Sequence, residues 1–99
     1  MNKEAQAGLG QLYRSVFEIE PNRIVFLGSD GSNRRYYRLS GGEISAVGAI
    51  NNDRRENIAF LSLSRHFRRH GLPVPEIYAE NLGKGVYLQQ DLGDDTLYD

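Results

Sequence analysis

The chain has 99 residues, of which 39% are hydrophobic and 25% charged, so it is long enough for one folded domain (1–99) and too short for two. This composition excludes disordered and collagen-like chains, and no apolar run approaches the roughly 20 residues that span a bilayer. The chain has no cysteine and its first residues do not resemble a signal peptide, so we expect a cytoplasmic protein with no membrane partner.

The basic residues are gathered in clusters although the formal net charge is only −1. Twelve residues are basic, and only Lys3 and Lys84 among them are lysines. The arginines group at 34–38, 54–55 and 65–69. Such clusters can bind phosphate groups, but the balanced total argues against a protein that coats DNA. An arginine cluster is more often a solvated face.

The first half of the chain predicts one helix followed by three strands. Apolar residues recur with helical spacing over 4–18, and Pro21 ends that segment. Residues 23–27, 34–39 and 44–50 are rich in β-branched and aromatic residues and are predicted to be strands. The segment 28–33, dense in glycine and serine, joins the first two strands, so we expect a hairpin there.

The second helix has clear signals at both ends. Asp53 is the predicted N-cap, with Glu56 three positions later in capping-box spacing. Gly71 is the predicted C-terminal stop. We expect the helix to bury a stripe formed by Phe60, Leu63 and Phe67 and widened by Ile58, Ala59 and Leu61.

Two more strands are predicted at 76–79 and 85–90, joined by a turn at 81–84. The order is therefore helix, three strands, helix, two strands. Short connections imply a largely antiparallel sheet with the second helix packed against it, which is an α+β layout.

The glycine-rich turn is the first candidate for a binding site. Backbone N–H groups in such a turn can approach a phosphate without obstruction by side chains. Gly28 and Gly31 are the positions for close approach, and Ser29, Ser32 and Asn33 offer further donors. The turn is neither a Walker P-loop nor a dinucleotide fingerprint. Glycine spacing alone favours an ordinary hairpin loop, which stays the alternative interpretation.

Three motifs in a fixed order favour a phosphate-binding turn over an ordinary hairpin loop. They occupy residues 28–39 (GSDGSNRRYYRL), 71–77 (GLPVPEI) and 86–94 (VYLQQDLGD). Residues 23–95 resemble the N-terminal lobe of the aminoglycoside phosphotransferase and choline-kinase-like superfamily of small-molecule kinases. The resemblance is greatest to its bacterial branch of sugar and cell-wall amino-sugar kinases. In that family the lobe is a five-stranded antiparallel sheet with one principal helix.

The resemblance implies a site for ATP or GTP with Mg²⁺ beneath the sheet. The loop would cover the phosphates. It consists of Gly28, Ser29, Asp30, Gly31, Ser32 and Asn33. Gln90, Asp91 and Leu92 would form the hinge, where backbone groups hydrogen-bond the base; without the family they are simply the exit of an edge strand.

The resemblance also implies that the catalytic and metal-binding residues belong to a C-terminal lobe that is missing here. We therefore assign no catalytic residue and no metal ligand, and we expect the domain to bind a nucleotide without transferring phosphate. The acceptor in the parent enzyme would be a small hydroxylated molecule such as a sugar. Removal of the second lobe should expose the cleft face, so we expect a homodimer through that face.

One departure from the kinase pattern is the third predicted strand, which carries no lysine to hold the α- and β-phosphates. Glu56 is in line with the expected apolar stripe, and a buried carboxylate needs a cationic partner. We hypothesise that Arg35 or Arg38 supplies that charge and helps to bind phosphate. The equal alternative is that Glu56 only closes the capping box with Asp53.

Other functions remain open from the sequence. The main rival is a stand-alone nucleic-acid-binding module that uses Arg34, Arg35 and Tyr36 with the arginines of the second helix, although the kinase resemblance makes nucleic acid an unlikely partner. Tyr36 and Tyr37 point to opposite faces of a strand, so only one of them can stack on bases. A regulatory domain that keeps the shape of the lobe is a further option. His66 and His70 have the spacing of a zinc pair, but no third ligand is evident, so we interpret them as surface histidines.

Overall fold

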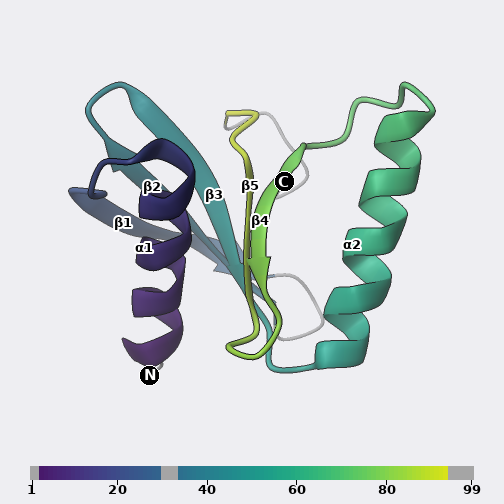
Figure 1. Ribbon diagram of the computed structural model, residues 1–99, viewed down its shortest axis with the longest axis horizontal. Helices are drawn as coiled ribbons and strands as arrows, with labels where there is room; N and C mark the ends of the chain where they lie inside the picture. The colour runs from purple at the N-terminus through teal and green to yellow at the C-terminus, as the bar shows by residue number, and fades with distance from the viewer. Residues whose placement is uncertain (1–2, 30–33, 94–99) are drawn as a thin grey trace.

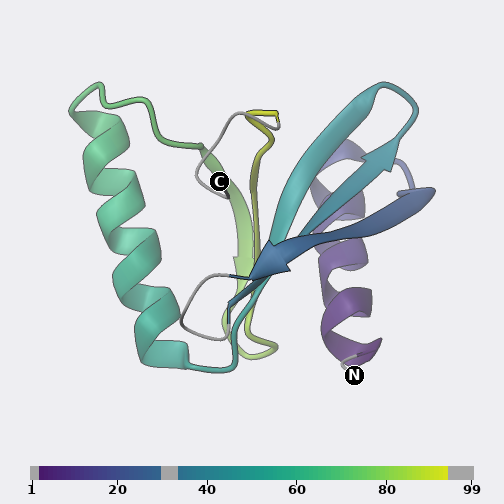
Figure 2. The same cartoon turned by 180° about the vertical axis from the view of Figure 1, so that it is seen from behind.

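A computed structural model describes residues 3–29 and 34–93 of the chain. The elements are α1 (Lys3–Phe17), β1 (Arg23–Ser29), β2 (Arg35–Gly41), β3 (Ile44–Ile50), α2 (Arg54–Arg69), β4 (Ile77–Asn81) and β5 (Val86–Gln90). The predicted α+β class is confirmed: one sheet has α1 on one face and α2 on the other (Figures 1 and 2). Within the described residues, no helix is both long and apolar enough to cross a membrane.

The sheet has five strands in the order β1-β2-β3-β5-β4, and all neighbouring pairs are antiparallel. Hairpins join β1 to β2, β2 to β3 and β4 to β5, whereas α2 and β4 lie in sequence between the paired strands β3 and β5. This arrangement puts the start of β2, the end of β3 and the start of β5 at one end of the sheet. The other end holds the start of β3 and the exit of β5.

The face covered by α1 is closely packed. Leu9 and Tyr13 of α1 are fully buried against Leu39 and Leu88. Backbone and side chain meet directly at Gly48, where an added Cβ would lie 2.6 Å from Leu9 Cδ2. The Tyr13 hydroxyl donates to the Ile44 carbonyl at 2.8 Å. An N-terminal helix is therefore an integral part of this domain.

The opposite face is covered only in part. Val47, Ala49 and Tyr87 are buried there with Leu61 of α2. Tyr36 belongs to this cluster, whereas its neighbour Tyr37 belongs to the α1 side, so their predicted opposite orientation is confirmed. Their relative exposures are 5% and 7%, so neither ring is offered as a stacking platform.

The predicted ends of α2 are confirmed. The Asp53 carboxylate accepts from the Glu56 backbone N–H at 3.1 Å and caps the first turn. The last helical residue is Arg69, and Gly71 follows in the left-handed region with φ of 79°. Its N–H donates to the Arg68 carbonyl at 3.0 Å, as glycine at this position commonly does.

The predicted buried stripe of α2 is wrong except at Leu61, which is 2% exposed. Leu63 is 51% exposed, and Phe60 and Phe67 are half-buried. The residues that the helix buries are Asn57, Leu61 and Ser64. The helix is thus turned by about one residue, roughly 100°, from the expected orientation. A hydrogen bond at 2.8 Å from Asn57 Nδ2 to the Asn51 carbonyl fixes that rotation.

Candidate functional site

The sheet face toward α2 carries the polar side chains. Alternation along the strands places Arg38, Ser45 and Gln89 on this face with Tyr36 and Val47. They form part of two polar clusters. One lies where β2 starts, beside the first turn of α2, and the other lies where β5 ends.

The first cluster is centred on Arg34, the residue between the glycine-rich loop and β2. Its side chain is only 8% exposed, and its NH2 group lies 3.7 Å from Glu56 Oε1. The guanidinium carbon lies 4.6 Å from the centre of the Phe60 ring, a cation–π distance. Phe60 in turn stacks on Tyr87 with 5.5 Å between ring centres. A buried cation is thus held between a carboxylate and an aromatic face.

Asn51 organises the surroundings of this cluster. Its side-chain Nδ2 donates to Glu56 Oε1 at 2.7 Å, and its Oδ1 accepts from the Asp53 N–H at 3.1 Å. Its own N–H donates to the Gly85 carbonyl at 2.9 Å. An added Cβ on Gly85 would lie 2.5 Å from the Asn51 carbonyl oxygen. One residue therefore ties the end of β3, the start of α2 and the β4–β5 turn together; the polar residues 51–53 were the available signal for it.

The hypothesis that Arg35 or Arg38 pairs with Glu56 is wrong. Arg34 takes that place. Arg35 is exposed and shares its face with Tyr37 and Leu39 on the α1 side, because it lies two positions from Tyr37 along β2. Arg38 contacts Asp91 instead.

The alternative for Glu56 also needs correction. Its backbone N–H is capped by Asp53, but its carboxylate turns to Asn51 and Arg34. The Asp53 N–H is bonded by Asn51 Oδ1, so Asn51 takes the place of the glutamate in the capping box.

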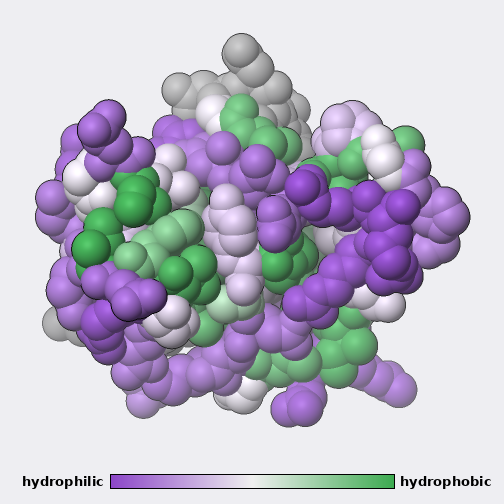
Figure 3. Space-filling view, turned by 45° about the horizontal axis from the view of Figure 1, so that its top comes forward, coloured by the Kyte–Doolittle hydropathy of each residue, from purple (hydrophilic) through white to green (hydrophobic). Residues whose placement is uncertain are grey.

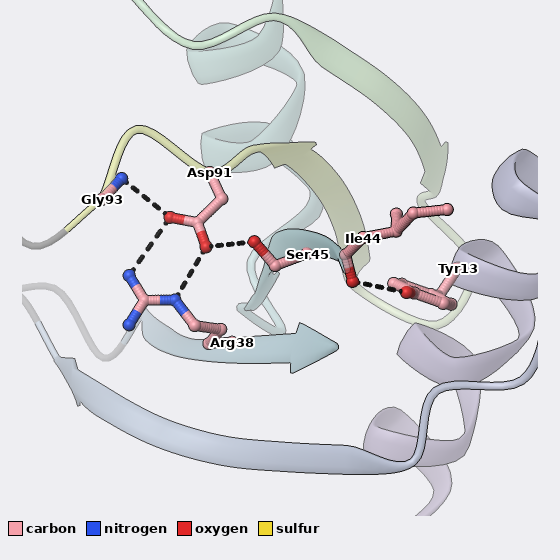
Figure 4. Close-up of polar contacts among 6 residues, drawn as sticks. All are labelled: Tyr13, Arg38, Ile44, Ser45, Asp91 and Gly93. Atoms are coloured by element: carbon pink, nitrogen blue, oxygen red, sulfur yellow. Dashed lines mark hydrogen bonds and ion pairs between the residues drawn. The ribbon is translucent and has the colours of Figure 1, made fainter. Parts of the chain in front are cut away.

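The second cluster surrounds Asp91, just after β5 (Figure 4). Arg38 Nε donates to Asp91 Oδ2 at 2.7 Å, and Arg38 NH2 donates to Oδ1 at 3.1 Å. Ser45 Oγ donates to Oδ2 at 2.8 Å, and the Gly93 N–H donates to Oδ1 at 2.9 Å. The side chain of Asp91 is 8% exposed. Two strands and the segment after β5 are thus fixed by one carboxylate.

The ionisation of Asp91 follows from these contacts. Burial by itself raises the pKa of the carboxyl group, because it disfavours the charged form. Hydrogen bonds from Arg38, the Gly93 N–H and Ser45, with the charge of Arg38, outweigh burial and lower the pKa below its ordinary 3.8. Asp91 is therefore a carboxylate at neutral pH.

The glycine-rich loop is described only at its start. Gly28 lies in β1 with φ of 152°, and the register with β2 shifts between Phe26 and Gly28. Among the residues that the structure describes, no atom lies within 4 Å of a Cβ added to Gly28. Ser29 is exposed. The predicted phosphate-binding positions Asp30, Gly31, Ser32 and Asn33 lie outside the described residues.

The predicted hinge has its first residue engaged in the sheet. The Gln90 N–H donates to the Glu76 carbonyl at 2.8 Å, and Gln90 Oε1 accepts from the Glu76 N–H at 3.2 Å. The Gln90 N–H is therefore occupied by the Glu76 carbonyl. Leu92 is 41% exposed.

The arginines of α2 lie close to carboxylates of the neighbouring edge of the sheet. Arg65 NH2 lies 2.7 Å from Glu80 Oε1, and Arg68 NH2 lies 3.7 Å from Glu76 Oε1. The rings of His66 and His70 have centres 4.5 Å apart. Residues 3–29 and 34–93 contain no group of three or more His, Cys, Asp or Glu side chains that could hold a metal ion.

Comparison with known proteins places these clusters in a context. The model of the phosphotransferase enzyme family matches residues 23–99, from the start of β1 onward. The N-acetylmuramate/N-acetylglucosamine kinase of Pseudomonas aeruginosa is 34% identical over 83 residues, which are 83% of this chain and 25% of that relative. The chain thus spans about a quarter of the relative's length. No solved structure matches the chain significantly.

Proposed function

This chain belongs to the phosphotransferase enzyme family, and on that premise we propose that it forms the nucleotide-binding lobe of a small-molecule kinase. The nucleotide is ATP, bound with Mg²⁺ on the sheet face toward α2. The acceptor is a small hydroxylated molecule of the sugar class, which the name of the Pseudomonas kinase supports.

The observation that carries this proposal is the placement of the two polar clusters at opposite ends of one sheet face. Arg34 and Arg38 are both on β2 or directly before it, four positions apart. At about 3.3 Å per residue their backbones are separated by about 13 Å. That span suits an extended nucleoside triphosphate, with the base near Asp91 and the phosphates near Arg34.

The glycine-rich turn lies at the phosphate end of this span. Gly28 and Ser29 pair with Tyr36 and Arg35, so the loop from 28 to 33 begins and ends next to Arg34. Its backbone at Gly28, which carries no side chain, suits close approach of an anion. At the base end, the Asp91 cluster fixes the course of the chain through the hinge positions.

We assign the catalytic groups and the metal ligands to a second lobe that packs against this face. Phosphoryl transfer needs a base, metal ions and charges that position the γ-phosphate, and a nucleotide-binding sheet alone does not supply them. The 99-residue chain therefore binds ATP and transfers no phosphate.

The test is a titration of the chain with ATP and magnesium, followed by the backbone amide signals in NMR spectra. We expect shifts confined to residues 28–33 and 90–92, even at millimolar affinity. Adenosine should shift only the hinge signals, and GTP serves as the comparison for base preference. Shifts spread over Arg65, Arg68 and Arg69 would contradict the proposal and favour a binding surface on α2.

A further inference from the structure

We propose that Arg34 supplies the positive charge that binds the nucleotide phosphates, in the role that a third-strand lysine has in other kinases. The inference rests on the proposed function, because it assigns a ligand to one residue of that site. It differs from the sequence-based hypothesis, which placed this role on Arg35 or Arg38.

A residue outside β3 must supply the positive charge, because β3 has no cation on the face toward α2. Kinases pair the lysine of this strand with a glutamate of the following helix. The β3 side chains on the face toward α2 are Ser45, Val47 and Ala49, none of which is charged. The glutamate is nevertheless present, since Glu56 lies in the first turn of α2.

Arg34 lies directly before the neighbouring strand, β2, at the same end of the sheet. Arg35 pairs with Ile50, the last residue of β3, so Arg34 lies beside the point where β3 leaves the sheet. Its NH2 group lies 3.7 Å from Glu56 Oε1. The kinase pair of cation and helix glutamate is thus reproduced with the cation displaced by one strand.

The contacts of Arg34 also prepare it for an anion. A guanidinium group has five N–H donors in a planar fork, which can bind a phosphate through two parallel hydrogen bonds. The Phe60 ring and the burial of the side chain hold Arg34 in place before any ligand arrives. Less rotamer freedom is therefore lost on binding than with an exposed arginine.

Comparison of the two arginine–carboxylate pairs supports this assignment. Asp91 binds Arg38 through two hydrogen bonds of 2.7 and 3.1 Å. Glu56 Oε1 lies 3.7 Å from Arg34 NH2 and accepts a hydrogen bond of 2.7 Å from Asn51 Nδ2. Arg38 is thus held by two short hydrogen bonds to its carboxylate, whereas Arg34 NH2 and Glu56 Oε1 form a longer ion pair.

The experiment compares the dissociation constants of ATP with magnesium and of adenosine for the chain and for Arg34→Ala. We expect the variant to bind ATP about 10- to 100-fold more weakly, the range for loss of a hydrogen bond to a charged group. Affinity for adenosine should be unchanged, because adenosine has no phosphate. Arg34→Lys should restore part of the affinity for ATP.

The matched control is Arg23→Ala, which removes an exposed arginine at the opposite end of β1. This variant should bind both ligands like the unaltered chain. If Arg34→Ala binds ATP as tightly as Arg23→Ala does, the assignment is wrong while the nucleotide site stands. If the unaltered chain binds neither ATP nor adenosine, the proposed function fails and the assignment fails with it.

A second measurement does not depend on the folding of a variant. The Nε–H signal of Arg34 can be followed by NMR in the unaltered chain. It should shift on addition of ATP and stay in place on addition of adenosine. An unmoved Arg34 signal, in a sample whose Gly28 and Ser29 amides shift with ATP, would overturn the assignment.

Discussion

At the scale of single residues, Asp91 shows how one carboxylate joins two strands and the segment that follows β5. We expect Asp91→Asn to lower the free energy of unfolding by about 1–3 kcal/mol, since it weakens charged hydrogen bonds to Arg38 in a largely buried site. Denaturant unfolding at pH 7 measures this change. Glu43→Gln removes an exposed carboxylate in the β2–β3 turn and should have little effect.

The loss of stability in Asp91→Asn should depend on pH. The pKa of Asp91 is lower in the folded chain than its ordinary 3.8, so the unfolded state binds more protons in that range. The contribution of Asp91 is therefore complete above about pH 5 and disappears as the pH falls through the folded-state pKa. The difference between Asp91→Asn and the unaltered chain should shrink as the pH is lowered from 5 toward 3. A difference that stays constant over this range would exclude the charged form as its cause.

At the scale of elements, α1 is fitted to β3 through Gly48, whose missing side chain leaves room for Leu9. Gly48→Ala should destabilise the chain by about 1–3 kcal/mol, because its Cβ would lie 2.6 and 2.9 Å from the methyl carbons of Leu9. Gly10→Ala is the matched variant within α1. Its Cβ meets nothing closer than Pro21 Cγ at 4.0 Å, so the better helix propensity should add about 0.5–1 kcal/mol.

Thermal or denaturant unfolding of the two glycine variants tests this packing. Gly48→Ala should lower the free energy of unfolding, whereas Gly10→Ala should raise it. If both variants are equally stable, α1 does not pack against β3 as described.

The elements also show what the sequence could and could not predict. The caps at Asp53 and Gly71 were predictable, because each signal depends on residues within one turn. The rotation of α2 was not, because it depends on the bond from Asn57 to Asn51, and the apolar pattern of Phe60 and its neighbours pointed elsewhere.

The assignment of the arginines failed for a similar reason. The cluster at 34–38 was visible in the sequence, but the partner of each arginine depends on strand alternation and on residues far along the chain. Arg38 meets Asp91 across 53 positions of sequence. Arg34 was weighed only for nucleic-acid binding, although alternation over the predicted strand 34–39 would have placed it on the face of Arg38 and away from that of Arg35.

At the scale of the whole molecule, the uneven covering of the sheet has a consequence for association. Hydrophobic surface gathers on the side of α1 and β1 in the space-filling view, whereas the side of α2 is mostly hydrophilic (Figure 3). The second lobe is proposed to cover the other face of the sheet, where Val25 of β1, 40% exposed, lies on the side of Arg38. We expect the isolated chain to form dimers through this face, and Val25→Ser to weaken them.

Light scattering at several concentrations measures this association. The average mass should rise toward that of a dimer as the concentration increases. A clean monomer at high concentration would contradict the prediction. If Val25→Ser leaves the dimer unchanged, the dimer contact lies on another face.

The hydrogen bonds around Asp91 also determine where the chain can bend. Because Arg38 and Ser45 hold the chain one residue beyond β5, the hinge positions move with the sheet as part of one rigid unit. Gly93, with φ of 88°, belongs to the same unit, because its N–H donates to Asp91 Oδ1 at 2.9 Å. A bend that leaves these hydrogen bonds intact therefore has to lie beyond Gly93, so a movement of whatever follows would not disturb the ends of β2, β3 and β5 that Asp91 joins.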